Sequence, residues 1–343
     1  MIILGIETSC DETAAAIVRD GVEVLSNTIV SQIDIFAEYG GVIPEIAARS
    51  HIEAILPVVD KALRDAGVTW DDVDSIAVTQ GPGLLGSLLI GVITARMLSK
   101  LHKKPLYAVN HVVAHTYANM LIDQKVEFPL LSLSVSGNHS HLLLFNDYLD
   151  YELLGATQDD AAGEAFDKVA KMMGLPYPGG PSVSKAALQG DENAYKLPKP
   201  RIEGKPLAFS FSGLKTAVLR LLQKEAGGDF TMPSFEIADK LSQKQIHDMA
   251  ASFQRTACEI LADKLELAYS QYQPKTVVIA GGVAANLRLR DEVQSRFDAK
   301  MHYAPMSLCT DNAAMIAAMG YQLALQNKTA DPDTLEADSN LAI

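Results

Sequence analysis

The stretch that decides the fold is Ile2-Ile-Leu-Gly-Ile-Glu-Thr-Ser-Cys-Asp-Glu-Thr-Ala-Ala-Ala-Ile-Val18. Its apolar start predicts a buried strand, a polar turn follows at Glu7–Thr13, and Ala14–Val18 predicts a second strand that pairs with the first. A similar unit recurs at residues 130–145, where two apolar runs flank the turn Ser136-Gly-Asn-His139. The recurrence predicts two lobes of similar construction.

A second kind of unit is also repeated, in the same order. A strand, a glycine turn and a helix are predicted at residues 75–100, around Gly81-Pro-Gly83, and again at residues 276–296, around Gly281-Gly282. A duplicated α/β core of this kind is typical of the actin-like, sugar-kinase and heat-shock-ATPase (ASKHA) architecture. In that architecture a nucleotide lies in the cleft between the lobes, and its phosphates meet backbone N–H groups of the turns.

Local signals set the expected boundaries of several further segments. Ser50 is a candidate N-cap for an amphipathic helix that ends at Gly67, and a long helix is expected from about Ile237 to Tyr269. For the domains we expect a first lobe of residues 1–110 plus about 311–330, and a second lobe of residues 111–310. The acidic, weakly apolar tail at 331–343 is expected to be mobile.

Composition narrows the class of protein. The chain has 343 residues with 48% hydrophobic and 21% charged residues, which are ordinary values for a folded α/β enzyme. Three cysteines, far apart, predict a reducing compartment, and neither a secretory signal nor a membrane-spanning run is found. We therefore expect a cytoplasmic protein without a membrane partner.

His111 and His115 stand four residues apart and are the most informative candidate ligands. This offset places two imidazoles on one face of a helix, within reach of one divalent metal ion. Asp311 is a plausible third ligand, which would complete a two-histidine, one-carboxylate set with open positions. The alternatives are two ordinary histidines at helical spacing and a favourable acidic residue at a helix N-terminus.

The predicted turns carry candidate substrate residues. Asp11 could assist proton transfer or orient a water, although Ser, Asp and Thr are also common turn formers. Gly137 and Asn138 tolerate positive φ, which would turn neighbouring N–H groups into an anion nest, but a plain hairpin would use the same residues. Asn286, four residues after Gly282, could meet a ribose or a base edge.

Eight motifs together resemble the tRNA N6-adenosine threonylcarbamoyltransferase family of bacteria, TsaD, once labelled a glycoprotein endopeptidase. The motifs that carry the resemblance are Gly5-Ile-Glu-Thr-Ser-Cys-Asp-Glu-Thr13, Gly81-Pro-Gly-Leu-Leu-Gly86, His111-Val-Val-Ala-His115, Asp159-Asp-Ala-Ala-Gly-Glu-Ala-Phe-Asp-Lys168, Tyr177-Pro-Gly-Gly-Pro181, Phe209-Ser-Phe-Ser-Gly-Leu-Lys-Thr216, Gly281-Gly-Val-Ala-Ala-Asn286 and Cys309-Thr-Asp-Asn312. The match runs in order from residue 1 to about 325. The family usually reads Ser-Gly-Gly-His-Thr where this chain has Ser136-Gly-Asn-His-Ser140, which puts close contact at Asn138 in question.

The resemblance implies transfer of a threonylcarbamoyl group from threonylcarbamoyl-AMP to N6 of the adenosine 3′ of the anticodon, in tRNAs reading codons that begin with A. It implies that His111, His115 and Asp311 hold a divalent metal, iron in the first place and zinc as the alternative. The residues that it implies for adenylate binding are Val135, Ser136, Gly137, Asn138, His139, Asp167, Gly180 and Asn286. The implied partners are tRNA, a TsaB-like protein on the first lobe, a TsaE-like ATPase and a TsaC-like synthase that supplies the substrate.

The charges of the chain give two opposite indications about a tRNA partner. The chain carries −13 overall, which disfavours a polyanion, yet residues 196–224 hold seven Lys or Arg against one Glu. Solvated surface is the alternative reading of this segment. We expect it to contact tRNA, together with Arg96, Lys100, Lys103 and Lys104 if these lie nearby.

Three other functions remain open from the sequence. A metallopeptidase of the His-Glu-x-x-His type needs a glutamate as general base where this chain has Val112. A kinase or ATPase is compatible with the same fold, because the cleft should admit adenine nucleotides. A scaffold without activity is the third reading, and the candidate metal ligands argue against it.

Overall fold

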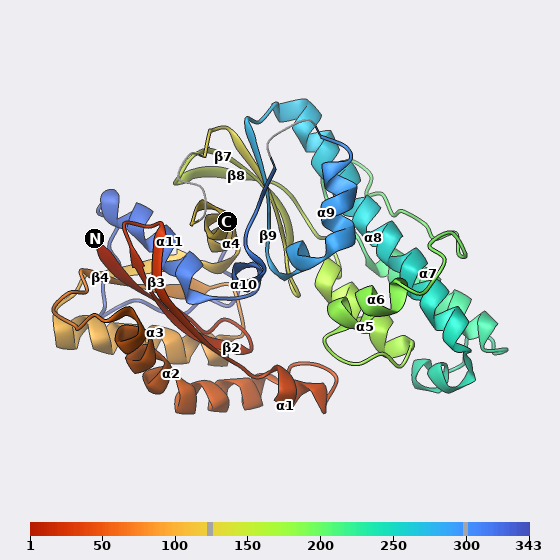
Figure 1. The fold of residues 1–343 in the computed structure, drawn as a ribbon, viewed down its shortest axis with the longest axis horizontal. Helices are drawn as coiled ribbons and strands as arrows, with labels where there is room; N and C mark the ends of the chain where they lie inside the picture. The colour runs from red at the N-terminus through yellow and green to blue at the C-terminus, as the bar shows by residue number, and fades with distance from the viewer. Residues whose placement is uncertain (122–125, 298–300) are drawn as a thin grey trace. The chain divides into compact units, whose positions relative to one another are not determined.

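The computed structural model describes residues 1–121, 126–297 and 301–343. The chain folds into two compact units (Figure 1). Unit 1 contains Met1–Glu127, Phe145–Tyr151 and His302–Ile343, and unit 2 contains Phe128–Leu144 and Glu152–Met301. In the described part of the chain, no helix is long and apolar enough to cross a bilayer.

Unit 1 is built on a five-stranded sheet with the order β3-β2-β1-β4-β5. Strand β1 pairs antiparallel with β2 and parallel with β4, and β4 pairs parallel with β5. The elements of this unit are β1 (Ile2–Glu7), β2 (Glu12–Arg19), β3 (Glu23–Ser31), α1 (Ile33–Ala37), α2 (Pro44–Ala66), β4 (Ser75–Gly81), α3 (Leu85–His102), β5 (Leu106–Asn110), α4 (His111–Met120), α10 (Met306–Cys309) and α11 (Ala313–Leu325).

Both faces of this sheet are covered by helices. Leu4 and Ile6 of β1 point into a core cluster with Ile55 of α2 and Val92 of α3. Gly5 points to the other face, because side chains alternate along a strand, and a Cβ there would lie 2.2 Å from a backbone oxygen of α11. Glycine at this position lets α11 pack directly on β1, which brings the start of α11 close to the end of β1.

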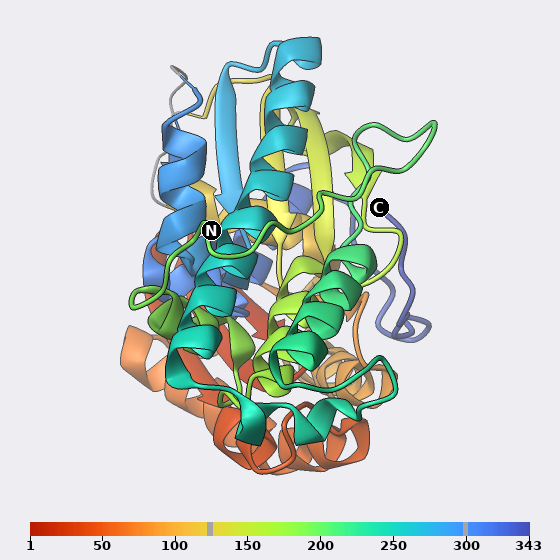
Figure 2. The ribbon, with the colours of Figure 1, turned by 90° about the vertical axis from the view of Figure 1, so that its right-hand side faces the viewer.

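Unit 2 has a second five-stranded sheet with the order β10-β9-β6-β7-β8, in which β6 and β9 are parallel. Helix α8 is its longest element, drawn in front of the strands in Figure 2, and Ser242 begins it with a capping box to Gln245. The remaining bounds are β6 (Leu130–Val135), β7 (Ser140–Asp147), β8 (Asp150–Ala156), α5 (Ala162–Met172), α6 (Gly179–Ala187), α7 (Ser212–Glu225), η1 (Ser234–Glu236), η2 (Ala238–Lys240), α8 (Gln243–Tyr272), β9 (Thr276–Ala280), η3 (Gly282–Ala285), α9 (Leu287–Gln294) and β10 (Met301–Tyr303).

Several local expectations differ from the structure. Helix α2 begins at Pro44, and Ser50 lies inside it and donates to the carbonyl of Ile46 instead of capping the helix. Proline suits the first turn of a helix, so this helix starts without a Ser or Asp cap. The expected end at Gly67 is confirmed, with φ of +66°. Strands β3 and β8 were not expected. Each of them pairs with the strand that precedes it along the chain.

The unit boundaries also differ from those expected. Helix α4, placed at the start of the second lobe from the sequence, belongs to unit 1 because it packs against α11 and follows β5 directly. The tail after Thr329 also belongs to unit 1 and makes hydrogen bonds there, for example from the amide of Ala330 to the carbonyl of Leu106. The expected mobility of the tail stays a prediction. A mobile tail would have to break these hydrogen bonds.

Candidate functional site

The two histidines lie on α4, and the local sequence explains their placement. Asn110 ends β5 and serves as N-cap of α4, its side-chain oxygen accepting from the amides of Val112 at 3.0 Å and Val113 at 3.2 Å. Asparagine is among the best N-cap residues, so the helix starts at His111. His115 follows about one turn later, on the same face of the helix. Both imidazoles are buried, and their ring centroids are 4.7 Å apart.

Asp311 joins these histidines from a segment about two hundred residues further along the chain. It lies between α10 and α11, directly before Asn312, which caps α11. Its Oδ1 is 3.6 Å from Nε2 of His111 and 3.3 Å from Nε2 of His115. Two ligands at about 2.1 Å from one metal ion lie roughly 3.0–3.4 Å apart in octahedral or tetrahedral geometry, so these spacings suit a shared ion.

The surroundings of His115 supply an independent test of the fit. Its side chain is 0% exposed, and within the described residues neither ring nitrogen has a hydrogen-bond partner. A buried polar atom without a partner costs about 1–3 kcal/mol, so a native protein rarely leaves one in place. A cation beside Nε2 would satisfy that atom. The three side chains therefore form a possible metal site.

A buried carboxylate supports His111 from behind. Oε2 of Glu7 is 2.9 Å from Nδ1 of His111 and accepts a hydrogen bond from Thr79 at 2.6 Å, while the amide of Ser9 donates to Oε1. When Nδ1–H of His111 donates to this carboxylate, the lone pair of Nε2 faces Asp311. This is the carboxylate–histidine arrangement common behind metal ligands.

Glu7 was not assigned a role from the sequence. The signal was present, since a glutamate ends an otherwise apolar strand, and such a side chain is rarely buried without a partner. Burial alone would raise the pKa of Glu7, yet attraction to and hydrogen bonding with His111 bring it below its usual value. Burial alone would lower the pKa of His111, but Glu7 and Asp311 raise it to about 9. The metal-free pair is thus an ion pair.

Asp11 lies in the β1–β2 turn of the same unit, with its side chain 9% exposed. Burial raises its pKa, although hydrogen bonds with Glu12 and Cys10 oppose that shift. Burial, followed by repulsion from Asp311 and Asp11, raises the pKa of Glu12 to about 10. Within the described residues Asp11 does not belong to the group that could share a metal ion.

The turn that carries Asp11 is held from α2 by His51, which the sequence left without a role. Nδ1 of His51 lies 2.7 Å from the hydroxyl of Thr13, and its Nε2 lies 3.0 Å from the carbonyl of Cys10. The side chain is fully buried. No local signal distinguishes this histidine from the others, because its partners come from a different element.

The predicted substrate turn lies at the end of β6 in unit 2. The amide of Ser136 donates to His139, and the amides of Gly163 and Glu164 at the start of α5 donate to the carbonyls of Ser136 and Gly137. In the described part of the chain positive φ values occur elsewhere, and neither Gly137 nor Asn138 has one. Neither residue therefore adopts the positive φ that was expected of it, and the binding role of this turn stays a prediction.

Gly281 makes the close approach that this turn requires. It has φ of +84°, and a Cβ there would lie 2.3 Å from the carbonyl oxygen of Val135. Only glycine accepts both the left-handed backbone and this contact. The η3 segment after β9 is thereby held directly against the end of β6, where the substrate turn begins.

The other predicted substrate residues adjoin the same part of unit 2. Asp167 on α5 accepts from the amide of Gly179 at 2.6 Å, at the start of α6, next to Gly180. Asn286 caps α9 and donates to Ser184 of α6 at 3.3 Å. Its side-chain nitrogen also donates to Gln254 of α8 at 3.1 Å, so the oxygen and the nitrogen of this amide are both engaged within the protein. Its expected approach to a ribose stays a prediction.

Comparison with known proteins decides the family. The model of the TsaD family, tRNA N6-adenosine threonylcarbamoyltransferase, matches residues 23–318. The chain belongs to the TsaD family. Three curated relatives carry the same name: one from Symbiobacterium thermophilum is 51% identical over 94% of this chain and 91% of the relative, one from Thermomicrobium roseum is 49% identical over 97% and 94%, and one from Bacillus cereus is 46% identical over 99% and 95%. The protein is therefore a transferase that acts on tRNA, as the motifs predicted.

Solved structures place this TsaD-family chain in the expected fold class. HypF from T. kodakarensis matches with a TM-score of 0.60 at 13% identity, over 95% of this chain and 48% of that one. Component A of (R)-2-hydroxyglutaryl-CoA dehydratase from Acidaminococcus fermentans matches with a TM-score of 0.52 at 16% identity, over 95% and 99%. At this identity the likeness shows the fold alone, and it confirms the ASKHA class.

Proposed function

We propose that this TsaD-family protein transfers the threonylcarbamoyl group from threonylcarbamoyl-AMP to N6 of the adenosine 3′ of the anticodon, in tRNAs reading codons that begin with A, and releases AMP. A divalent metal ion, Fe²⁺ in the first place and Zn²⁺ as the alternative, would be held by His111, His115 and Asp311. The observation that carries the metal is the pair of buried ring nitrogens of His115 that have no hydrogen-bond partner within the described residues, beside a carboxylate at 3.3 Å.

The reaction depends more on charge stabilisation than on a strong nucleophile. In the reaction the N6–carbonyl bond forms, the bond from that carbonyl to the phosphate oxygen of AMP breaks, and N6 loses one proton. A metal with open positions would supply Lewis acidity and would fix the substrate. The protein's residues do the rest: Glu7 keeps His111 oriented, and the turn from Val135 to His139, with Asp167, Gly180 and Asn286, would bind the adenylate.

Asp11 is our candidate for the acceptor of the N6 proton. Its buried position raises its pKa above the usual value of an aspartate, which suits a group that takes up a proton at physiological pH. The weak nucleophilicity of an exocyclic amine makes correct placement of the tRNA a large part of the rate.

A single-turnover assay tests this function. Protein stripped of metal, then given Fe²⁺ or Zn²⁺, is mixed with threonylcarbamoyl-AMP and an anticodon stem-loop, with and without the TsaB-like and TsaE-like partners. We expect modified adenosine and one AMP per transfer only with metal restored. Steady ATP hydrolysis without tRNA would instead favour an ATPase, and casein cleavage would favour a peptidase.

The structure sorts the cations of the basic segment at residues 196–224 into paired and unpaired ones. Lys199 is bound by Glu259 at 2.8 Å and Asp263 at 3.1 Å, and Lys215 is bound by Asp160. The exposed cations with no ion pair among the described residues are Lys196, Arg201, Lys205, Arg220 and Lys224. Arg201 also lines a groove of about 650 Å³ with Lys199 and Lys264. We propose that the unpaired set contacts tRNA phosphates.

We expect replacement of Arg201 and Lys205 by Met to weaken tRNA binding and to lower the salt slope of log affinity by about 1.5, because roughly two phosphate contacts are lost. Lys199→Met is the matched control, since that charge is already neutralised. Filter binding across a salt series measures both. An unchanged slope in the double variant would show that the segment is only solvated surface.

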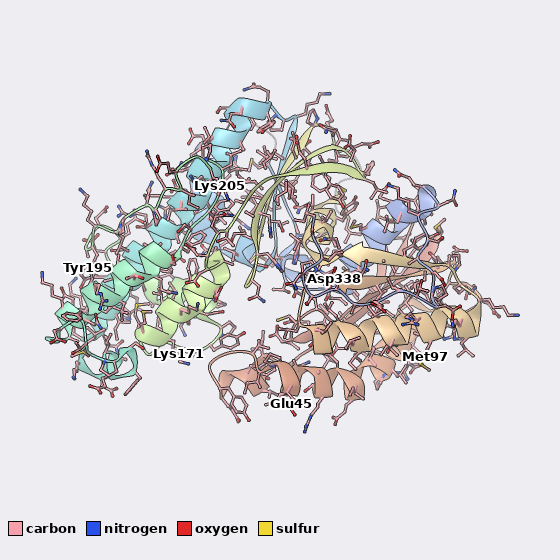
Figure 3. All side chains as sticks on the ribbon, turned by 180° about the vertical axis from the view of Figure 1, so that it is seen from behind. Glu45, Met97, Lys171, Tyr195, Lys205 and Asp338 are labelled. Carbon is pink, nitrogen blue, oxygen red and sulfur yellow. The ribbon has the colours of Figure 1, made fainter. Side chains whose placement is uncertain are left out.

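The outer face of α3 is our candidate for the TsaB-like partner. Leu85, Leu89, Ile93, Met97 and Leu101 recur every four residues and are 40–73% exposed, with Met97 labelled in Figure 3. Ile52 and Leu56 of α2, the helix packed beside α3, are also about 60% exposed. A contiguous apolar stripe on a helix usually marks a protein interface, because water would otherwise cover it at a cost.

A further inference from the structure

The end of the chain crosses unit 1 as a segment of turns and irregular backbone, residues 330–342, here called the C-terminal strap. Its first half is anchored on α3. The guanidinium of Arg96 donates to three strap carbonyls, those of Pro332 at 2.7 Å, Asp333 at 2.7 Å and Leu335 at 3.1 Å. Lys100 pairs with the carboxylate of Asp333, and the side chain of Leu335 is buried in the core cluster. The strap is thus attached independently of its last residues.

Four hydrogen bonds attach the second half of the strap, the first from the side chain of Gln80 to the carbonyl of Glu336 at 3.2 Å. The amide of Asp338 donates to the carbonyl of Gln80 at 2.9 Å, and the amide of Gly83 donates to Ser339 at 3.3 Å. The side-chain N–H of Asn110 donates to the carbonyl of Ala342 at 3.2 Å. Figure 1 accordingly draws the C-terminus next to α4, and Figure 3 labels Asp338 in this unit.

Each of these points adjoins a group that supports the metal ligands. Gln80 follows Thr79, which donates to Glu7. Gly83 precedes Leu84, whose amide donates to the carbonyl of Ser9 at 2.8 Å, in the turn that carries Asp11. Asn110 is the N-cap of α4 itself. The strap therefore ties together the end of β4, the loop after it and the start of the histidine helix.

We propose that the second half of the C-terminal strap positions the metal centre by clamping the three backbone segments that hold Glu7, Ser9 and His111 in register. This inference rests on the proposed function in that it takes the cluster of His111, His115 and Asp311 to bind a metal ion. Supports behind metal ligands typically change metal affinity by about 10- to 100-fold when they are lost, because the ligands then have to be ordered on binding.

Gly81 offers a way to displace the strap without shortening it. A Cβ at Gly81 would lie 1.8 Å from the carbonyl oxygen of Asp338, and the next two atoms it would meet also belong to Asp338 and Leu341. The nearest obstacles are thus all strap atoms. Gly81→Ala should push the strap away in the full-length chain and should meet no such obstacle in a chain that ends at Leu335.

The experiment compares four proteins: the full chain, a chain ending at Leu335, Gly81→Ala, and both changes together. Zinc alone is titrated in competition with a chelator, and amide exchange of Val112 and Val113 is followed in the metal-free proteins. We expect the truncation and Gly81→Ala each to weaken zinc binding at least about tenfold and to speed exchange of these two amides. Gly81→Ala should add nothing in the truncated chain. Similar melting temperatures would show that all four proteins keep the fold. We expect this because the truncated chain still contains Leu335, which is buried in the core.

Zinc affinity and amide exchange equal to those of the full chain, in both single variants, would overturn the clamp. A further loss on combining the two changes would also overturn it, because Gly81→Ala would then act locally. If the full chain took up no zinc, the proposed metal centre would fail, and the exchange rates of Val112 and Val113 would decide the clamp by themselves.

Discussion

His115→Ala should abolish metal binding and lower the single-turnover rate of threonylcarbamoyl transfer by at least about 1,000-fold, since Lewis-acid stabilisation is worth several kcal/mol. The reason lies in the geometry: only His111 and Asp311 would remain, at 3.6 Å from each other, and two ligands hold a divalent ion poorly. Metal content after dialysis and the rate of transfer to an anticodon stem-loop measure the two effects.

Two further variants show whether the loss comes from the ligand. His115→Cys keeps a zinc ligand of smaller size and should retain more zinc than the alanine variant. His247→Ala removes a histidine of unit 2 that does not belong to the cluster, and it should leave zinc content unchanged. A full complement of tightly bound zinc in His115→Ala would refute the metal centre proposed for this protein.

Ile93→Glu combined with Met97→Glu should abolish the complex with the TsaB-like partner, weakening it by at least about 100-fold. Two charges would be placed in the middle of the apolar stripe, where burial on binding would leave them without partners. Both side chains are exposed in the free chain, so the melting temperature should change little. Size-exclusion chromatography and calorimetric titration with the partner measure the loss.

Leu188→Glu is the matched control for this surface. Leu188 is 86% exposed, belongs to unit 2 and lies outside the stripe on α3. The same exchange of an apolar side chain for glutamate should leave complex formation intact there. If the stripe variant still bound the partner with normal affinity, the apolar face of α3 would need another occupant, and the partner's site would lie elsewhere on the chain.

Much of the fold could be predicted because its signals are local. The strand and turn at residues 2–13, the glycine turn before α3 and the cap at Gly67 follow from patterns of a few residues. The start of α2 was misplaced, because Pro44 is a weaker signal than a capping side chain. Strands β3 and β8 escaped notice, since neither sequence alternates apolar and polar residues regularly along its length, and consecutive residues are exposed in both.

The candidate site could likewise be predicted only in part from the sequence. Helical spacing placed His111 and His115 on one face, and the structure adds Asn110 as the cap that sets their register. Asp311 was proposed as the third ligand because it completes a two-histidine, one-carboxylate set, and the resemblance implied it as well. The structure brings it within 3.3 Å of His115. The neutralisation of Lys199 by two carboxylates could not be anticipated, because Glu259 and Asp263 come from a helix that local charge counting does not include.

What the sequence determined by itself was the class of fold and the family, together with the face of α4 that carries two imidazoles, because these depend on backbone geometry over a few residues and on motifs in order. Only the tertiary structure shows that Glu7 contacts His111, that His51 contacts the turn of Asp11, and that Asn110 donates a hydrogen bond to the end of the strap. These contacts join residues 41 to 232 positions apart in the chain. Such approaches arise from packing of the whole unit, which no local pattern encodes.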